Sequence, residues 1–494
     1  MAGRTAWILG DQLSHDHPAL AGADRVLIIE SRAKLASGRF HRQKLHLIVS
    51  AMRHFAAELA ERGFEVDMRR AESLPSGLRS HVREHRPDSV TIIRPHRIEA
   101  ERTLGELDRV EVVDGGLFLT NPDDFAAWAG ERKRLVMEDF YREQRRRHDL
   151  LIDDGEPAGG QWNLDHENRE PPPSDERPPA PYRPREDEID AEVRTDLDAM
   201  GLGASGVDAP RRFPATRAEA KRALRSFVED RLPRFGPYQD AILDSEPFMW
   251  HAMLGAALNL GLLSPLECAR AAEKAYRAGD APLASVEGFI RQLIGWREYV
   301  WGVYRLRGGE WERMNALRAR GRLPESFWDG DTEMRCLASV AGKVRETAYA
   351  HHIERLMIAG NLMLLLGVAP REAYDWFHRS FADGYEWVMA PNVLGMAIWA
   401  DGGRMMTKPY AASGRYVDRM SDHCGDCRFD PGSRTGPDAC PITTLYWDFL
   451  ARNRPRLQDN RRMALQLRNL DRIDVDELAE IRSRARGLRR TQRL

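Results

Sequence analysis

The sequence predicts an amino-terminal α/β part built on a parallel, Rossmann-like sheet, followed by a large all-helical part. Up to about residue 150, short β-branched runs alternate with amphipathic stretches, a pattern typical of parallel strands joined by helices. Beyond about residue 215, apolar residues recur with helical spacing and few strand-like runs remain. The length of 494 residues also exceeds what one hydrophobic core supports, so we expect more than one domain.

Five β-branched runs in the first part predict its strands. They are residues 5–9, 25–30, 64–68, 89–94 and 110–113, and the amphipathic stretches 41–62 and 77–86 predict helices between them. Parallel sheets of this kind bind ligands at the carboxyl ends of their strands. The first part contains neither a G-x-G-x-x-G nor a P-loop pattern, so a standard dinucleotide or ATP site is not predicted there.

An acidic, proline-rich segment separates the two parts. Between residues 153 and 190 it carries twelve acidic residues, four arginines and eight prolines. This composition predicts an extended interdomain linker. The expected divisions are therefore an α/β domain over residues 1–150, a linker over 151–215 and an all-helical domain over 216–494.

Residues typical of helix ends mark boundaries in the helical part. Helix starts are predicted at Ser264, Ser285 and Pro370, and helix ends at Gly279, Gly308 and Gly367. The final stretch, residues 451–494, holds thirteen arginines against six acidic residues. It is either a face that meets phosphate or a solvated surface.

Four of the five cysteines predict a metal centre. Cys424 and Cys427 form a Cys-x-x-Cys pair, Cys440 follows closely, and Cys336 lies well before them. Four thiolates from two separated segments can bind either Zn²⁺ or an iron–sulfur cluster, and the spacing leaves both open. Cys268 lies in an alanine-rich helical pattern and is expected in the core.

The overall composition is that of a soluble globular protein, with 42% hydrophobic and 30% charged residues. The sequence has no run of eighteen apolar residues and no basic-then-apolar leader, so we expect a cytoplasmic protein without a membrane segment. In that reducing compartment, clustered thiols are more plausible as metal ligands than as disulfides.

One motif in the helical part, residues 287–299, reads Glu-Gly-Phe-Ile-Arg-Gln-Leu-Ile-Gly-Trp-Arg-Glu-Tyr. It resembles the flavin-domain motif of the photolyase/cryptochrome family. Segments 348–357 and 386–396, together with the order of the four cysteines, resemble more narrowly the prokaryotic iron–sulfur photolyases that repair the (6-4) photoproduct. This resemblance implies light-driven DNA repair with FAD, and a 4Fe–4S cluster on Cys336, Cys424, Cys427 and Cys440.

The resemblance also implies roles for individual residues. The expected flavin contacts are Tyr238, Trp250, His251, Gln292, Arg297, Glu298, Glu386 and Asn392, with Asn392 or a neighbour facing the isoalloxazine ring. His352 is expected to be the general acid toward the lesion, with His351 as its partner. Asp165, Arg169 and Tyr410 are expected to contact the flipped nucleotides, and Lys408 and arginines the phosphates.

Electron supply and light harvesting show two departures from the family pattern. Trp328 and Trp376 match positions of the electron path to the flavin, but Phe377 stands where a tyrosine is usual and is a poor hopping station. A lumazine antenna is expected near the first two strands, with Gly10, Asp11, Gln12 and Glu30 as contacts. Residues 31–40 lack the acidic and aromatic side chains expected beside that ring.

Two other functions remain open within the same fold. A cryptochrome-like photoreceptor would keep the flavin and lose the lesion chemistry, and a cyclobutane-dimer photolyase would need no acid–base histidine. The retained His351-His352 pair, Asp165, Arg169 and Tyr410 favour (6-4) repair. The expected partner is UV-damaged DNA, bound by a monomer associated with the nucleoid, and Mg²⁺ is a further candidate cofactor.

Overall fold

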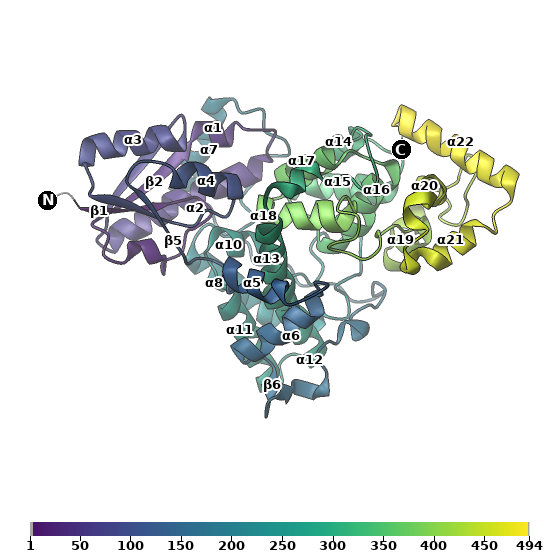
Figure 1. The fold of residues 1–494 in the computed structure, drawn as a ribbon, viewed down its shortest axis with the longest axis horizontal. Helices are drawn as coiled ribbons and strands as arrows, with labels where there is room; N and C mark the ends of the chain where they lie inside the picture. The colour runs from purple at the N-terminus through teal and green to yellow at the C-terminus, as the bar shows by residue number, and fades with distance from the viewer. Residues whose placement is uncertain (1–2, 493) are drawn as a thin grey trace.

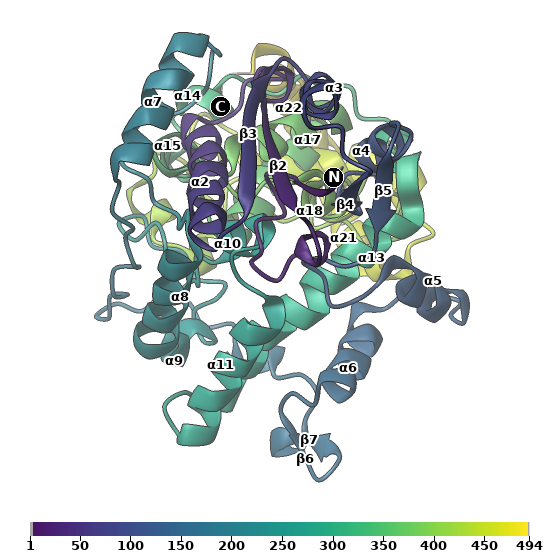
Figure 2. The ribbon, with the colours of Figure 1, turned by 90° about the vertical axis from the view of Figure 1, so that its left-hand side faces the viewer.

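The computed structural model describes residues 3–492 and 494. Its sheet has five parallel strands in the order β3-β2-β1-β4-β5, seen in the foreground of Figure 2. The strands are β1 (Arg4–Ile8), β2 (Arg25–Ser31), β3 (Glu65–Ala71), β4 (Ser89–Ile93) and β5 (Val110–Val113). All five predicted strands are confirmed within a few residues, and so is the predicted parallel sheet.

The two faces of this sheet are covered by different helices. Because side chains alternate along a strand, Ala6 and Ile8 of β1 pack on the side of α2 (Arg42–Glu61), whereas Trp7 faces the opposite layer. That opposite layer contains α3 (Leu74–His85) and α4 (Ile98–Gly105). The two predicted helices correspond to α2 and α3, and a short α1 (Arg32–Leu35) follows β2.

The segment between the sheet and the helical body contains three helices, a small hairpin and irregular stretches. It begins with α5 (Pro122–Gly130), α6 (Met137–His148) and a small hairpin of β6 (Ile152–Asp153) and β7 (Glu156–Pro157). Within the predicted linker, α7 (Glu188–Met200) packs through Val193 and Leu197 against Leu45 and Val49 of α2. Figure 2 shows α7 beside α2 at the edge of the α/β layer.

The rest of the chain is helical, as predicted, and forms the lower and right-hand parts of Figure 1. Its first helices are α8 (Arg217–Ser226), η4 (Phe227–Arg231), α9 (Leu232–Phe235), α10 (Gly255–Leu260), α11 (Pro265–Ala278), α12 (Leu283–Ile290), η5 (Arg291–Arg297) and α13 (Glu298–Arg307). Then follow η6 (Gly308–Arg313), α14 (Ser326–Asp329), α15 (Arg335–Thr347), η7 (Glu354–Gly360), α16 (Asn361–Leu366), α17 (Pro370–Ser380), α18 (Glu386–Met389) and η8 (Ala390–Ala397). The last are α19 (Gly414–Met420), η9 (His423–Asp426), α20 (Pro441–Leu457), η10 (Arg461–Met463), α21 (Ala464–Leu470) and α22 (Val475–Thr491).

Most capping signals in this part are confirmed. Ser264 caps α11 with a capping box to Glu267, and Pro370 opens α17. Gly279, Gly308 and Gly367 end α11, α13 and α16. The predicted start at Ser285 is wrong, because α12 begins two residues earlier and Ser285 lies inside it, where its hydroxyl accepts a hydrogen bond from the Gly236 amide.

One hydrophobic cluster joins the α/β layer to the first helices of the helical body. It runs from Ala6 and Ile8 of β1 through α2 to Ile290 and Ile294. The expected divisions at residues 150 and 215 therefore stay a prediction. In the part of the chain that the structure describes, no helix is long and apolar enough to cross a membrane.

A buried ion triad anchors the linker helix. Arg211 donates from Nε to Asp190 Oδ1 at 2.9 Å and from a terminal nitrogen to Glu219 Oε2 at 2.7 Å. All three side chains are buried. Burial opposes ionisation of Asp190, but the nearby His54 ring, 3.8 Å away, and the hydrogen bonds from Arg211 outweigh it and hold the pKa of the carboxyl far below its usual value.

Asp190→Ala should therefore leave Arg211 as a buried charge without its bidentate partner and destabilise the protein by about 3–5 kcal/mol. The Asp190 contribution is complete above the unfolded carboxyl pKa of about 3.9 and declines as the pH falls further. Urea unfolding at pH 7 measures the change. The matched control is Asp471→Ala, which removes an exposed pair with Arg454 and should hardly move the midpoint. Equal shifts for both variants would contradict the anchoring role.

Candidate functional site

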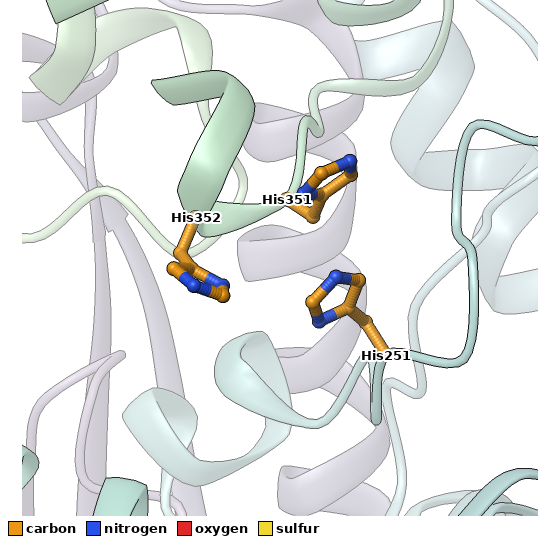
Figure 3. A group of neighbouring side chains, drawn as sticks. All are labelled: His251, His351 and His352. Atoms are coloured by element: carbon orange, nitrogen blue, oxygen red, sulfur yellow. The ribbon is translucent and has the colours of Figure 1, made fainter. Parts of the chain in front are cut away.

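Three histidines lie together where the start of η7 meets the segment before α10. Figure 3 shows His251 pointing toward His351 and His352 from the facing segment. The rings of His251 and His351 are stacked with centroids 4.6 Å apart, and the ring of His352 lies edge-on to His251 at 5.5 Å. His251 and His351 are buried, whereas the side chain of His352 is 53% exposed. Only His352 of the three can therefore meet a bulky substrate directly.

The two buried rings are held neutral. Burial lowers the pKa of His351 well below its ordinary value, and the neighbouring His352 lowers it further. Burial and then the proximity of His351 lower the pKa of His251 in the same way. Both ring nitrogens of His351 and Nε2 of His251 are buried without a hydrogen bond among the residues that the structure describes. Such unpaired polar atoms are unusual in a native interior and indicate a missing polar partner.

A buried arginine organises the second part of the site. Arg291, at the start of η5, bonds Asp165 Oδ1 at 2.7 Å, and its Nε lies 3.3 Å from Glu287 Oε1. Glu287 in turn accepts a hydrogen bond from the Leu164 amide at 3.0 Å. Arg169 pairs with the other oxygen of Asp165. Burial disfavours the charged form of Asp165, but Arg291 and Arg169 together lower its pKa.

Asp240 joins the exposed histidine to this group. Its Oδ1 lies 3.1 Å from His352 Nε2. Burial raises the pKa of the Tyr410 phenol. The charge of Arg169 lowers this pKa, whereas the charges of Asp165 and Asp240 raise it further. Tyr410 therefore lies within electrostatic range of all three charged side chains. The structure thus brings together His352, Asp165, Arg169 and Tyr410, which the sequence predicted as one site.

Three residues of this group received no role from the sequence. Asp240 lies two residues after the predicted Tyr238, Tyr416 lies six residues after Tyr410, and Arg291 stands in the quoted flavin motif. Burial followed by the charge of Asp240 raises the pKa of Tyr416 to about 12, so this phenol also borders the group. Only the tertiary contacts identify them, because their spacing carries no recognisable ligand pattern.

The predicted flavin contacts fall into two sets. Tyr238 and Trp250 pack ring against ring at 4.8 Å beside His251. Gln292 and Asn392 donate within their own helices to Gly288 and Val388. Gln292 lies in η5 and Asn392 in η8, and both of these segments are π-helical, as is η7 after the histidine pair. Segments of π-helix often occur at functional sites.

The second set, Arg297, Glu298 and Glu386, contacts the amino-terminal part of the chain. Glu298 accepts hydrogen bonds from the amides of Leu119 and Thr120 at 2.8 and 2.9 Å. Arg297 donates to Glu298 and to the Leu117 carbonyl, yet two of its buried nitrogens have no partner among the described residues. Glu386 pairs with Arg97 at 2.7 Å and accepts a hydrogen bond from the Tyr304 hydroxyl. Their flavin role stays a prediction.

The four predicted cysteines converge near the carboxyl-terminal helices. Cys336 lies in α15, Cys424 and Cys427 flank the end of η9, and Cys440 caps α20. Burial raises the pKa of the Cys336 thiol, and each of the other three thiols raises it further, so all four cysteines belong to one region of the helical body. A Cβ at Gly414 would lie 3.0 Å from the Cys440 sulfur, so the site leaves room beside that thiol only for glycine. Cys268 is buried elsewhere, as expected.

The two predicted electron-path tryptophans lie in neighbouring helices. Trp376 of α17 is buried and donates from its indole nitrogen to the Phe327 carbonyl, the residue before Trp328 in α14. Phe377 contacts Trp376 edge-on at 4.9 Å. The guanidinium of Arg39 lies 4.9 Å from the partly exposed Trp328 ring. The geometry therefore places an indole at the surface and another in the core.

The residues expected beside an antenna are largely engaged in the α/β layer. Glu30 forms a bidentate pair with Arg53 at 2.7 and 3.1 Å, and Gln12 donates to the carbonyls of Ile93 and Arg94. Asp11 bonds His96 at 3.0 Å. Antenna binding at these positions stays a prediction.

Known proteins resemble this chain, two of them over nearly its whole length. A family model described as deoxyribodipyrimidine photo-lyase-related protein matches residues 6–211. The "(6-4) photolyase" of Agrobacterium fabrum (strain C58 / ATCC 33970) is 42% identical over 495 residues, covering 97% of each chain. A short uncharacterized protein of Acanthamoeba polyphaga mimivirus is 36% identical over 97 residues, covering 20% of this chain and 72% of its own. The crystal structure of a bacterial class III photolyase from Agrobacterium tumefaciens matches with a TM-score of 0.58, 15% identity and coverage of 99% and 98%.

The parallel α/β layer joined to a helical body is the fold of the photolyases, shared with the solved bacterial class III photolyase. Within that class, the chain belongs to the (6-4) photolyase family, because the sequence identity to the bacterial relative extends over 97% of both chains.

Acidification should destabilise the protein through His251 and His351. Their folded-state pKa values lie below the unfolded value of about 6.5, so the unfolded state binds more protons and stability falls as the pH drops below that value. His351→Asn should reduce the slope between about pH 6 and pH 5 by roughly 1.4 kcal/mol per pH unit, one proton's worth. Urea unfolding across this range measures it. His166→Asn, which alters an exposed ring, should keep the original slope.

Proposed function

We propose that the protein reverts (6-4) pyrimidine–pyrimidone photoproducts in DNA by light-driven electron transfer from reduced FAD. The observation that carries this proposal is the exposed His352 held by Asp240 next to the Asp165–Arg169 pair and Tyr410. The bacterial relative named (6-4) photolyase, 42% identical over nearly the whole chain, supports the choice of lesion.

The acid–base part of the reaction falls to His352. A photoproduct must leave the base stack to reach a buried site, and the flipped nucleotides then expose polar edges to the protein. His352 would donate a proton from its imidazole to the lesion, and Asp240 would orient the ring. The stacked, neutral His351 would support the fold beneath it rather than transfer the proton.

Recognition of the flipped nucleotides falls to the arginine-bound carboxylate. Arg291 and Arg169 keep Asp165 ionised and fix its direction, so it would accept hydrogen bonds from base N–H groups. Tyr410 would donate or stack beside the bases. Lys408 and nearby arginines would contact the phosphates, which gives binding that weakens with salt. Asp165 and Asp240 would also offer carboxylate oxygens to Mg²⁺.

The flavin would lie among Tyr238, Trp250, His251, Gln292 and Asn392. The unpaired buried nitrogens of His251 and Arg231, and of Arg297 farther along, are donors suited to an anionic, polar cofactor. When bound, reduced FAD supplies the electron that cleaves the photoproduct. The surrounding aromatic side chains would exclude water from it, and Trp376 and Trp328 would carry electrons inward from the surface. Phe377 would leave that supply slow.

The four cysteines would hold a 4Fe–4S cluster. Thiolates are the ligands of such clusters, and these four link α15 to the segments at η9 and α20, so the cluster would cross-link distant parts of the helical body. A lumazine antenna in the α/β layer would have to bind beside Glu30 and Gln12, which already have protein partners.

His352→Asn should abolish repair of an oligonucleotide carrying a (6-4) lesion under blue light, because amide nitrogen cannot act as an acid near neutral pH. Flavin absorbance should be unchanged. His15→Asn, which alters a surface histidine of the α/β layer paired with Glu58, should repair at the wild-type rate. Full repair by the His352 variant would contradict the assignment, and wild-type protein with flavin but without repair would indicate a photoreceptor.

Cys336→Ser should lose iron and inorganic sulfide, because a [4Fe–4S] cluster needs all four thiolates. Metal analysis of the wild type should give about four iron atoms per chain. Cys268→Ser is the matched control. It should keep the full iron content, because Cys268 is buried in a hydrophobic cluster away from the four predicted ligands. Zinc in place of iron would overturn the cluster assignment and leave the ligand assignment intact.

A further inference from the structure

An arginine-lined pocket lies in the carboxyl-terminal part of the helical body, at a place the repair site does not use. Its cavity volume is about 170 Å³, and it is bordered by the 318–322 segment, the end of α16, α20 and α22. Figure 1 shows the carboxyl terminus and the end of α22 close to α14 and α16. None of the residues assigned to the flavin, the lesion or the cluster lines it.

The lining of this pocket is strongly and uniformly basic. Five arginines contribute to it, and no acidic side chain does; they are Arg318, Arg320, Arg322, Arg452 and Arg489. The first three are exposed, and the structure gives their side chains no ion pair or hydrogen bond within the described residues. Arg452 and Arg489 share a single carboxylate, Asp448. The charge of the pocket is therefore largely uncompensated by protein.

The arginines are presented by backbone that is fixed in place. The Gly321 amide donates to the Gly367 carbonyl at 2.8 Å, and the Ala369 amide donates to the Gly321 carbonyl at 2.7 Å. The side-chain amide of Gln492 donates to the Arg322 carbonyl at 3.2 Å. Arg452 bonds the Leu365 carbonyl at 2.9 Å, at the end of α16. Five cationic groups are thus gathered from segments far apart in the sequence, with Asp448 as the one carboxylate paired with any of them among the described residues.

Such an arrangement is electrostatically unfavourable without an anion. Like charges a few ångströms apart repel, and burial followed by the charge of Arg489 lowers the pKa of Arg452. A phosphate group would relieve the repulsion, because its oxygens accept paired hydrogen bonds from guanidinium forks. Arg318, Arg320 and Arg322 offer three such guanidinium groups to the same pocket.

We propose that this pocket binds phosphate groups, either those of a DNA backbone or those of a small phosphate compound. The proposal does not depend on the repair reaction, because the pocket is separate from the lesion and flavin residues. If the source is DNA, the contact would hold the duplex independently of damage and sequence.

The test uses the Arg320→Gln/Arg322→Gln double variant of the full-length protein. Titration calorimetry with pyrophosphate should show binding to the wild type and at least about a tenfold loss in the variant if the ligand is a small phosphate compound. Fluorescence anisotropy with an undamaged duplex across a salt series should show a salt slope lower by about two in the variant if the ligand is DNA. Thermal unfolding checks that the variant is folded.

The matched control is Arg79→Gln/Arg225→Gln, which removes two exposed arginines on α3 and α8 that form no ion pair with any residue the structure describes. It should bind pyrophosphate and duplex like the wild type. A pyrophosphate effect alone identifies a small phosphate compound, and a duplex effect alone identifies DNA. If the pocket variant matches the control in both assays, the proposal is overturned, and because neither assay uses light or a lesion, that result leaves the proposed repair function untouched.

Discussion

The site depends on one buried cation, Arg291. A guanidinium in the protein interior is tolerated only with good partners, and Arg291 has two carboxylates, Asp165 and Glu287. Glu287 also holds the Leu164 amide, so the linker exit is attached to η5 by a chain of charged hydrogen bonds. The direction of Asp165, and with it the position of Arg169, follows from this attachment. Without this attachment, a carboxylate on a loop would be held less firmly in one direction.

Buried charges also join the α/β layer to the helical body. Lys44 of α2 bonds the His378 carbonyl at 2.7 Å and the Gly384 carbonyl, and burial lowers its pKa to about 7. Glu298 holds the Leu119 and Thr120 amides in the same manner. These contacts cross between parts of the chain that are distant in sequence. They fix the α/β layer and the helical body relative to each other.

The histidine pair shows how neighbouring residues of one type receive different roles. Successive positions at a helix start point in different directions, so His351 enters the core and stacks on His251 while His352 reaches the surface and meets Asp240. Burial lowers the pKa of His351 and keeps it neutral, whereas the side chain of His352 is exposed to solvent. Two neighbouring residues of the same type thus differ in solvent access because the fold points them in different directions.

The sequence by itself determined the local and periodic features of this protein. Alternating β-branched runs predicted the five parallel strands, because a period of two residues is set by strand geometry, and Ser264, Pro370 and the terminal glycines predicted helix ends through local hydrogen bonding. The cysteine spacing predicted a metal centre, and the motif around residue 291 predicted the family. Ser285 misled because its hydroxyl bonds Gly236, a partner 49 positions away.

Only the tertiary structure decided which of these residues meet. Asp240, Tyr416 and Arg291 became part of the site through contacts between segments separated by many residues, and no periodicity encodes such contacts. The same holds for the arginine pocket. Arg322 and Arg489 line it together, although more than half of the helical body separates them in the sequence. Local propensity acts over a few residues, whereas charge pairing and burial act between whatever surfaces the fold brings into contact.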